Sequence, residues 1–286
     1  MPARALIAGA GYLGRALACH LVAAGHEVVV VRRSETAPPP GATAFRADLA
    51  APGALTGLPP AELAFYTAAA DAATDTAYER AYVTGVARLI ERLASQPTPP
   101  RRLLYTSSTA VYAQRHGEWV DETSPTDPDA FPGRRLLAGE AVVRAAPFPA
   151  AVLRLGGIYG PGRAALVDRV LRGEARTAPG PPRYTNRIHR DDAAAALAWL
   201  ADSRHTERCL IGVDCEPAPQ ADVMGWLAER LGVPPPRADD SPPAGAAGRS
   251  ASNKRCSNAL LLATGFRFRY PTWREGYEAL LRERGA

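Results

Sequence analysis

The sequence predicts an α/β protein, a Rossmann-type doubly wound parallel sheet with a small C-terminal lobe. Three observations support this fold class. Short apolar runs alternate with stretches of helical periodicity, as a parallel sheet with crossover helices requires. A glycine-rich turn follows the first apolar run. The chain of 286 residues is long enough to bury one such core and a smaller lobe.

The expected core elements follow in chain order. Seven strands are predicted, at Arg4 to Ala8, Glu27 to Val31, Ala42 to Arg46, Leu63 to Thr67, Arg102 to Thr106, Ala150 to Leu155 and Cys209 to Val213. Four helices lie between them, at Arg15 to Ala24, Ala77 to Ala94, Arg134 to Ala145 and Asp191 to Ala201. The carboxyl ends of such strands meet at one edge of the sheet, where binding groups collect.

The last third of the chain changes in composition. Three helices are expected there, within Pro217 to Leu231, over Asn258 to Ala263 with Ser257 as N-cap and Gly265 as stop, and from Trp273 to Arg284. The stretch 234–252 is rich in Pro, Ala, Gly and Ser and predicts a mobile loop. We therefore expect a core of residues 1–163, completed by 187–215, and a substrate lobe of residues 164–186 and 216–286.

Composition excludes several classes of protein. The 47% hydrophobic and 22% charged content is typical of a globular protein. No apolar stretch is long enough to span a bilayer and no signal peptide precedes the first strand, so we expect a cytoplasmic protein without a membrane partner. The net charge is +5 but the arginines are scattered, so nucleic acid is not an expected partner. The four cysteines lack CxxC spacing, so no metal is expected.

A GxGxxG turn lies between the first strand and the first helix. Gly9 permits the sharp turn, Gly11 leaves room for a pyrophosphate, and Gly14 lets the helix pack closely on the strand. The helix N-terminus offers unpaired N–H groups to anionic oxygens, and Tyr12 and Leu13 within the turn are expected cofactor contacts. These features predict a dinucleotide-binding site.

The residues after the second strand indicate which dinucleotide binds. Arg32, Arg33 and Ser34 stand where an acidic residue would accept hydrogen bonds from the ribose of NAD, and guanidinium groups suit the 2′-phosphate of NADP. We therefore expect NADP (NADPH). The simpler interpretation is that arginine is the usual surface cation of this chain, whose single lysine is Lys254. Further cofactor contacts are expected after the third and fourth strands, at Asp48, Leu49, Thr67 and Ala68.

Further motifs follow the later strands. They are Asp48-Leu49, Thr106 through Tyr112, Asp121-Glu122 with Pro125 and Pro128, Arg154 with Gly160 to Arg163, and Arg187 to Asp192. With the glycine turn, these motifs resemble the extended short-chain dehydrogenase/reductase family, often described as NAD-dependent epimerase/dehydratase, and in particular its atypical members. The similarity covers nearly the whole chain. It implies an NAD(P)-dependent reaction on a small-molecule substrate.

In that family, chemistry rests on a serine after the fifth strand and a Tyr-x-x-x-Lys pair in the next helix. The tyrosine transfers a proton while a hydride passes to or from the nicotinamide. Ser108 matches the serine. The nearest alignment of the pair places Phe131 at the tyrosine and Arg135 at the lysine, and neither residue can transfer a proton near neutral pH.

Three explanations of the missing pair remain open. Tyr159, just past the sixth strand, is the best-placed tyrosine to supply the proton, although it equally fits a packing residue in a turn. Alternatively, the reaction needs only hydride transfer, with Ser108 and water completing the proton path. In the third, the protein binds NADP(H) without turnover, as a redox-sensing regulator. We expect an oxidoreductase or epimerase acting on a small polar substrate, with the regulator as the alternative.

Other polar residues border the expected lobe. Arg163 and Asn186 are candidates to orient an anionic substrate. His189 titrates near neutrality, but its segment resembles the part of the family that holds the lobe to the core. Lys254 and Arg255 follow the expected loop and either close over the cofactor or, more simply, form a solvated basic pair.

Overall fold

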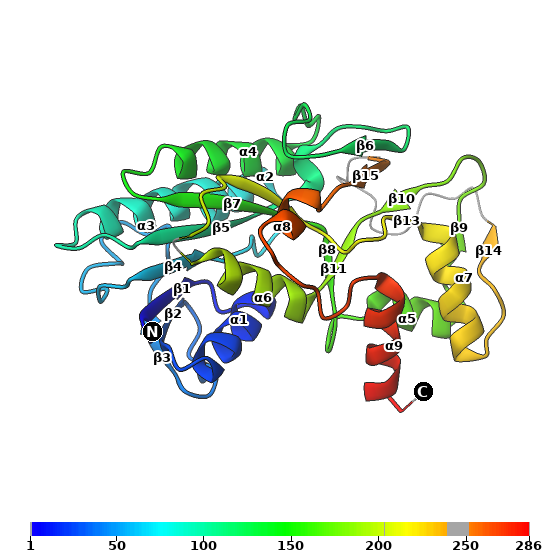
Figure 1. Ribbon diagram of the computed structural model, residues 1–286, viewed down its shortest axis with the longest axis horizontal. Coiled ribbons are helices and arrows are strands. Elements are labelled where there is room, and N and C mark those ends of the chain that lie inside the picture. Colours follow the sequence, from blue (N-terminus) through cyan, green and yellow to red (C-terminus); the bar gives the residue numbers. More distant parts are fainter. Residues whose placement is uncertain (1, 203, 239–251, 286) are drawn as a thin grey trace.

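The computed structural model describes residues 2–202, 204–238 and 252–285. Its centre is a seven-stranded sheet in the order β12-β7-β5-β4-β1-β2-β3, with every neighbouring pair parallel. The strands are β1 (Arg4–Ala8), β2 (Glu27–Arg32), β3 (Ala42–Arg46), β4 (Leu63–Tyr66), β5 (Arg102–Ser108), β7 (Ala150–Leu155) and β12 (Cys209–Gly212). Helices cover both faces of the sheet (Figure 1). The predicted doubly wound α/β fold is confirmed.

Two apolar cores fill the spaces between the sheet and its helices. On one face, α1 (Tyr12–Ala23) and α6 (Arg190–Leu200) cover the sheet, and on the other α3 (Gly85–Ala94) and α4 (Phe131–Arg144) do so (Figure 1). Within β1, Ile7 belongs to the first core and Leu6 to the second, and both are fully buried. Successive side chains of a strand point to opposite faces, so a strand covered on both sides is apolar throughout.

The predicted helices begin earlier in the structure than in the sequence pattern. The helix expected at Arg15 begins at Tyr12, where Gly11 is an N-cap with extended backbone. The helix expected at Arg134 begins at Phe131, because Pro132 lies in the first turn. A proline is tolerated there, since the first N–H groups of a helix have no partner within the helix.

The single helix expected over residues 77–94 is divided into three pieces. A short α2 (Asp75–Tyr78) leads into a π-helical turn, η1 (Glu79–Thr84), and then into α3. Two tyrosine hydroxyls from the sheet bind carbonyls of this turn, since Tyr66 donates to Ala81 O and Tyr105 donates to Tyr82 O at 3.2 Å. These bonds satisfy carbonyls in a turn where the α-helical hydrogen-bond pattern is interrupted.

A third apolar cluster lies beyond the end of the sheet. It is formed by α5 (Ala165–Leu171), α7 (Gln220–Leu231) and α9 (Trp273–Glu283), which lie at the right of Figure 1. Helix α8 (Ala259–Ala263) has Asn258 rather than the predicted Ser257 as its N-cap, although Ser257 Oγ accepts from the Ala259 N–H at 3.3 Å. The division into a core and a substrate lobe stays a prediction.

Eight short strands form pairs that the sequence did not predict. They are β6 (Glu118–Val120) with β15 (Lys254–Cys256), β8 (Gly157–Tyr159) with β11 (Arg187–His189), β9 (Arg176–Thr177) with β14 (Arg237–Ala238), and β10 (Tyr184–Thr185) with β13 (Ala218–Pro219). Strand β14 lies within the expected mobile loop, and most of that loop, residues 239–251, lies outside the described residues. Within the described ranges, no helix has the length and apolarity of a membrane span.

Candidate active site

A cleft of about 1170 Å³ opens at the carboxyl ends of the central strands. It brings together most of the residues expected from the sequence, namely Gly9, Gly11, Tyr12, Leu13, Arg32, Arg33, Ser34, Asp48, Leu49, Thr67, Ala68, Ser108, Arg163 and Asn186. Gly14 and Tyr159 lie outside its lining. Strand β1 has β2 on one side and β4 on the other, so the glycine turn lies where the strand order reverses. Ligands of doubly wound sheets bind at this position.

The glycine turn has the shape that a pyrophosphate needs. Gly9 has φ +107°, and a Cβ there would collide with the backbone of Ala68. A Cβ at Gly14 would overlap the Gly9 carbonyl oxygen and approach Thr67 Oγ1 to 2.7 Å. Gly11, by contrast, faces open space, and no side chain caps α1 there. The helix N-terminus is therefore left to an anion, so these residues fit the diphosphate of a dinucleotide.

Two arginines stand at the end of β2 with different partners. Arg32 donates to Ser34 Oγ at 2.7 Å, to Ala37 O at 2.8 Å and to the Thr36 hydroxyl, so it is held by its own loop. Arg33 pairs with Asp71 at 3.0 Å, with both side chains more than half exposed. Arg33 is therefore the arginine that is easily released to a ligand, because an exposed ion pair is weak.

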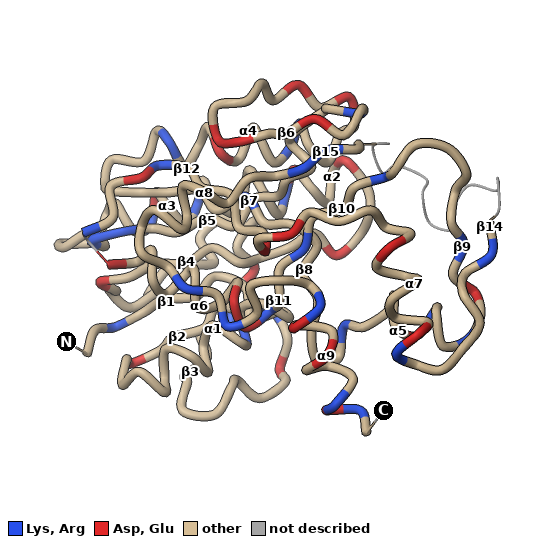
Figure 2. Tube along the Cα trace, turned by 45° about the vertical axis from the view of Figure 1, so that its right-hand side comes forward, with Lys and Arg blue, Asp and Glu red and all other residues tan. Residues whose placement is uncertain are grey.

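The carboxylates near this end of the cleft are also paired. Glu35 accepts from Arg46 at 2.6 Å, and Asp48 accepts from Arg80 at 2.9 Å. Each of these carboxylates therefore has a guanidinium as its partner, so the charge that a ribose hydroxyl would meet there is already partly neutralised. The mixture of charges is general, since basic and acidic segments are interspersed along the whole trace in Figure 2.

Ser108 is held in place at the end of β5. It is the N-cap of a 3-10 turn, η2 (Thr109–Val111), and its Oγ accepts from the Ala110 N–H at 3.1 Å. The preceding Ser107 donates to Glu140 Oε1 at 2.7 Å. These contacts fix the backbone that carries the Ser108 hydroxyl.

A buried ion pair supports the same strand end from behind. Glu140 is fully buried and accepts from Arg154 at 2.7 and 3.0 Å. Arg154 also donates to the Tyr112 hydroxyl at 2.7 Å. A buried pair with all its hydrogen bonds made holds its surroundings in one arrangement.

The two residues aligned with the proton-transfer pair lie in different surroundings. Phe131 lines the cleft, but Arg135 does not. Arg135 instead binds both oxygens of Asp75, at 2.6 and 2.7 Å, and Glu79 at 2.6 Å. Its guanidinium is therefore committed to two carboxylates on the neighbouring helical segment and is not available to act on a tyrosine or a cofactor.

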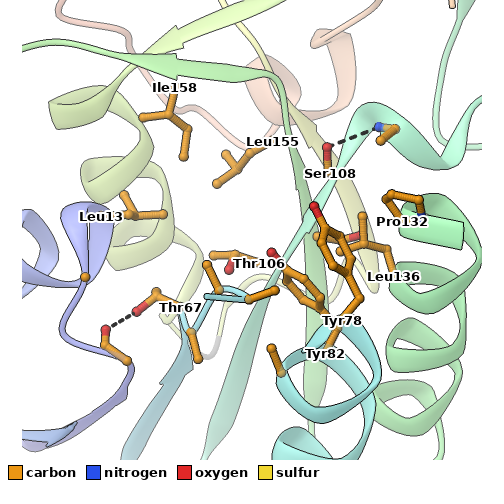
Figure 3. Close-up of a pocket in the computed structure, with 18 of the residues that line it drawn as sticks. Leu13, Thr67, Tyr78, Tyr82, Thr106, Ser108, Pro132, Leu136, Leu155 and Ile158 are labelled. Atoms are coloured by element: carbon orange, nitrogen blue, oxygen red, sulfur yellow. Dashed lines mark hydrogen bonds between the residues drawn. The ribbon is translucent and has the colours of Figure 1, made fainter. Parts of the chain in front are cut away.

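Tyrosines from the interrupted helix form the cleft wall beside Phe131. The ring of Tyr78 meets that of Phe131 edge to face at 5.3 Å and lies 5.1 Å from the ring of Tyr82. In Figure 3 the Tyr78 side chain extends toward Ser108 on the wall formed with Pro132. Tyr78 is not among the site residues predicted from the sequence, in which one continuous helix is expected at this position.

Tyr159 is not brought to Ser108. Its side chain is buried away from the cleft, stacked on Tyr277 at 4.4 Å and edge to face on His189 at 5.4 Å. Burial raises its pKa far above the usual range of tyrosine. The structure therefore corrects the expectation of a catalytic Tyr159, which occupies the packing position that the sequence left as the alternative.

His189 is also remote from the cleft lining. Its Nδ1 accepts from the Asp191 N–H at 3.2 Å and caps α6, and burial lowers its pKa to about 4. Nearby, the Asp192 carboxylate accepts from the Arg269 and Tyr270 N–H groups at 2.7 and 3.0 Å. This segment attaches the C-terminal part of the chain to the core, as the resemblance implied.

The two expected substrate contacts differ in their freedom. Arg163 is exposed, with its guanidinium 5.5 Å from the centre of the Tyr12 ring. Asn186 has both ends of its amide committed, because it donates to Lys254 O at 3.0 Å and accepts from the Cys256 N–H at 2.7 Å. Lys254 itself is 3% exposed and lines the cleft, so the expectation of a solvated lysine was wrong.

Comparisons with known proteins agree with this architecture. Residues 5–212 match the sequence model of the NAD dependent epimerase/dehydratase family. A 3-diazoavenalumate denitrifying reductase from a Streptomyces species is 31% identical over 96% of this chain and 98% of its own length. A solved structure described as an NAD-dependent epimerase/dehydratase from Methylobacillus flagellatus is 36% identical, covers all of both chains and superposes with a TM-score of 0.83. A human epimerase family protein with NADPH is 24% identical over 98% of this chain and 99% of its own, with a TM-score of 0.80, which indicates the fold alone.

Proposed function

Since the chain belongs to the NAD dependent epimerase/dehydratase family, we propose that it is an NADPH-dependent reductase that delivers a hydride to a small polar substrate without a tyrosine-lysine proton relay. One observation carries this proposal. Phe131 lines the cleft where the relay tyrosine is expected, and Arg135 is bound to Asp75 and Glu79. The reaction must therefore be one that does not depend on that relay.

The cofactor proposal rests on the charges at the end of β2. Arg33 faces the cleft with only an exposed ion pair to Asp71, while Glu35 and Asp48 are each paired with another arginine. A dianionic 2′-phosphate fits such a guanidinium, whereas the hydroxyls of an unphosphorylated ribose would need a free carboxylate. When bound, NADPH supplies the hydride.

Proton balance favours a reductase over an epimerase. Epimerisation through a ketone removes a proton from a hydroxyl and returns it, so it needs a resident base. The relative named as a denitrifying reductase acts on a diazo compound. In the corresponding reduction of a diazonium carbon, the hydride electrons form the new C–H bond and the electrons of the C–N bond leave with dinitrogen. No proton is consumed. We propose a substrate of this kind, which accepts a hydride and releases a leaving group.

The cofactor part is tested by titrating NADPH and NADH into the protein and its Arg33→Ala variant. We expect NADPH to bind about tenfold more tightly than NADH, and the variant to lose most of that difference. Arg101→Ala is the matched control, because Arg101 also forms an exposed pair, with Glu62 at 2.9 Å, outside the cleft. Equal affinities for the two cofactors in the unaltered protein would refute NADPH preference.

The reaction part is tested with 4-carboxybenzenediazonium as the probe. The protein with NADPH deuterated at C4 should convert it to benzoate that carries the deuterium, and the rate should fall in the Phe131→Asp variant, which places a charge in the cleft wall. Tight NADPH binding with no oxidation of NADPH by this probe would contradict the reductase and favour the non-catalytic, redox-sensing regulator.

A further inference from the structure

The cleft contains a buried positive charge that the proposed hydride transfer does not use. The chain has 34 Lys and Arg residues, of which Lys254 is the one lysine, and this lysine is 3% exposed at the cleft lining. Its ammonium donates to the carbonyl oxygen of Tyr112 at 3.2 Å. No carboxylate among the described residues forms an ion pair with it. A buried ammonium without a counter-ion is unfavourable, so its presence in a cleft calls for a functional reason.

The fold fixes the backbone on both sides of this lysine. Strand β15 pairs in parallel with β6, and the amide of Asn186 bonds to Lys254 O and to the Cys256 N–H. The amide of Asn253 accepts from the Tyr184 N–H at 2.8 Å and donates to Pro182 O at 3.0 Å. Two asparagines thus hold the segment to β10 and the chain beside it. The fold therefore fixes the backbone from which the Lys254 side chain extends.

The cleft that Lys254 lines also has aromatic and apolar walls. Tyr78, Phe131 and Tyr184 line the same cleft as Lys254. Figure 3 shows Tyr78 with Pro132 and Leu136 on the wall beside Ser108. Flat apolar walls with one buried cation are complementary to a planar ring that bears a single negative group.

We propose that the Lys254 ammonium binds the carboxylate of an aromatic substrate, whose ring packs on the Tyr78 and Phe131 wall. The inference rests on the proposed function only in taking this cleft as the place where substrate binds. Lysine suits such a site because its ammonium is a compact charge on a flexible stem. The guanidinium of an arginine would be bulkier and planar. The carboxylate becomes the counter-ion that no described residue supplies.

The single lysine makes a direct test possible. Protein labelled with carbon-13 lysine gives one side-chain Cε–Hε NMR correlation, which needs no assignment. The probes are benzoate, 4-hydroxybenzoate and cinnamate, each compared with its uncharged amide. We expect the carboxylates to shift the Lys254 signal and to bind about tenfold more tightly than the amides.

Variants separate ligand binding from a purely structural contact. Lys254→Met keeps the length of the side chain and removes the charge, and it should bind carboxylates and amides equally. Arg101→Ala removes an exposed positive charge outside the cleft lining and should leave carboxylate affinity unchanged. The proposal is overturned if none of the three carboxylates moves the signal, if the amides bind as well, or if the preference survives in Lys254→Met.

Failure of this inference and failure of the proposed function are distinguishable in the same samples. NADPH affinity is measured on each preparation before the probes are added. Carboxylate binding at Lys254 without NADPH binding supports the anion site and contradicts the reductase. NADPH binding with no carboxylate preference leaves the reductase standing and contradicts the anion site.

Discussion

Replacing Lys254 by methionine should make the protein more stable, although it removes a hydrogen bond. Methionine matches the stem of lysine in length and adapts to irregular surroundings, so the packing of β15 is retained. What is lost is the bond to Tyr112 O, at 3.2 Å. The variant also removes the free-energy cost of burying an ammonium that no described carboxylate neutralises.

A comparison of the two free-energy contributions favours the Lys254→Met variant. A hydrogen bond from a charged donor contributes about 1.5–3 kcal/mol. The effective penalty for burying an ion is several kcal/mol even after the protein relaxes. The difference predicts that Lys254→Met gains about 1 kcal/mol or more in free energy of unfolding. For a chain of this size, that corresponds to a rise in Tm of about 2 °C.

The pKa of Lys254 determines how the stability difference between the two proteins changes with pH. Burial lowers the pKa of Lys254 from its ordinary value of 10.5, and the Cys256 thiol is the titratable group that acts against this shift. Between the lowered pKa and 10.5, the unfolded chain therefore binds more protons than the folded one. The stability of the lysine protein must rise with pH through that window. The advantage of the methionine variant should be largest below the window and shrink above it.

Urea unfolding of both proteins at neutral and alkaline pH measures this difference. Arg255→Gln is the control for loss of a hydrogen bond from a charged donor, since Arg255 is half-buried and donates to Gly117 O at 2.7 Å from the next position of the same strand. A methionine variant that is less stable than the lysine protein at neutral pH would show that the bond to Tyr112 outweighs burial of the charge. Lys254 would then be a structural residue, and the prediction that burial of its charge is net destabilising would be wrong.

Three further predictions concern the turn, the buried ion pair and the reaction. Gly14→Ala should lower both Tm and NADPH affinity, because its Cβ would overlap the Gly9 carbonyl oxygen; calorimetry that finds neither change contradicts the packing argument. Glu140→Gln should lower the free energy of unfolding by about 3 kcal/mol in urea titrations, because it leaves the buried Arg154 without its counter-ion. In turnover of the diazonium probe, kcat should be independent of pH across the neutral range while kcat/KM falls as Lys254 loses its proton; a bell-shaped kcat would indicate a resident acid or base.

Much of the fold could be predicted because burial leaves a periodic trace in the sequence. Strands β1 and β2 are covered on both faces, so the runs Ala5 to Ala8 and Val28 to Val31 are wholly apolar and are visible without knowledge of their partners. The glycine turn was equally visible, because Gly9 and Gly14 are required by local geometry. These signals depend only on neighbouring residues.

The substrate end of the cleft could not be predicted in the same way. Lys254 meets Tyr112 across 142 residues of sequence, through strands of three residues that are too short for periodicity to indicate. The position of Tyr159 depends on Tyr277, another distant contact. The direction of Tyr78 follows from a π-helical turn that is held by hydroxyls of the sheet. Only the rarity of lysine in the composition distinguished Lys254 beforehand.

The buried charges in and behind the cleft are of two kinds, and the difference suggests where the binding energy for a substrate comes from. Arg154 is buried with Glu140, so its charge is neutralised in the folded protein and serves to hold β5 and its serine in place. Lys254 is buried without such a partner among residues 2–202, 204–238 and 252–285, and it lines the cleft. An anion that enters the cleft relieves an unfavourable charge that folding has already enclosed, so the interaction is stronger than one made in water. If the substrate is held in this way, and NADPH by the glycine turn and Arg33, both ligands lie in the cleft that Ser108 also lines, and the hydride has only to cross to a carbon that is already fixed.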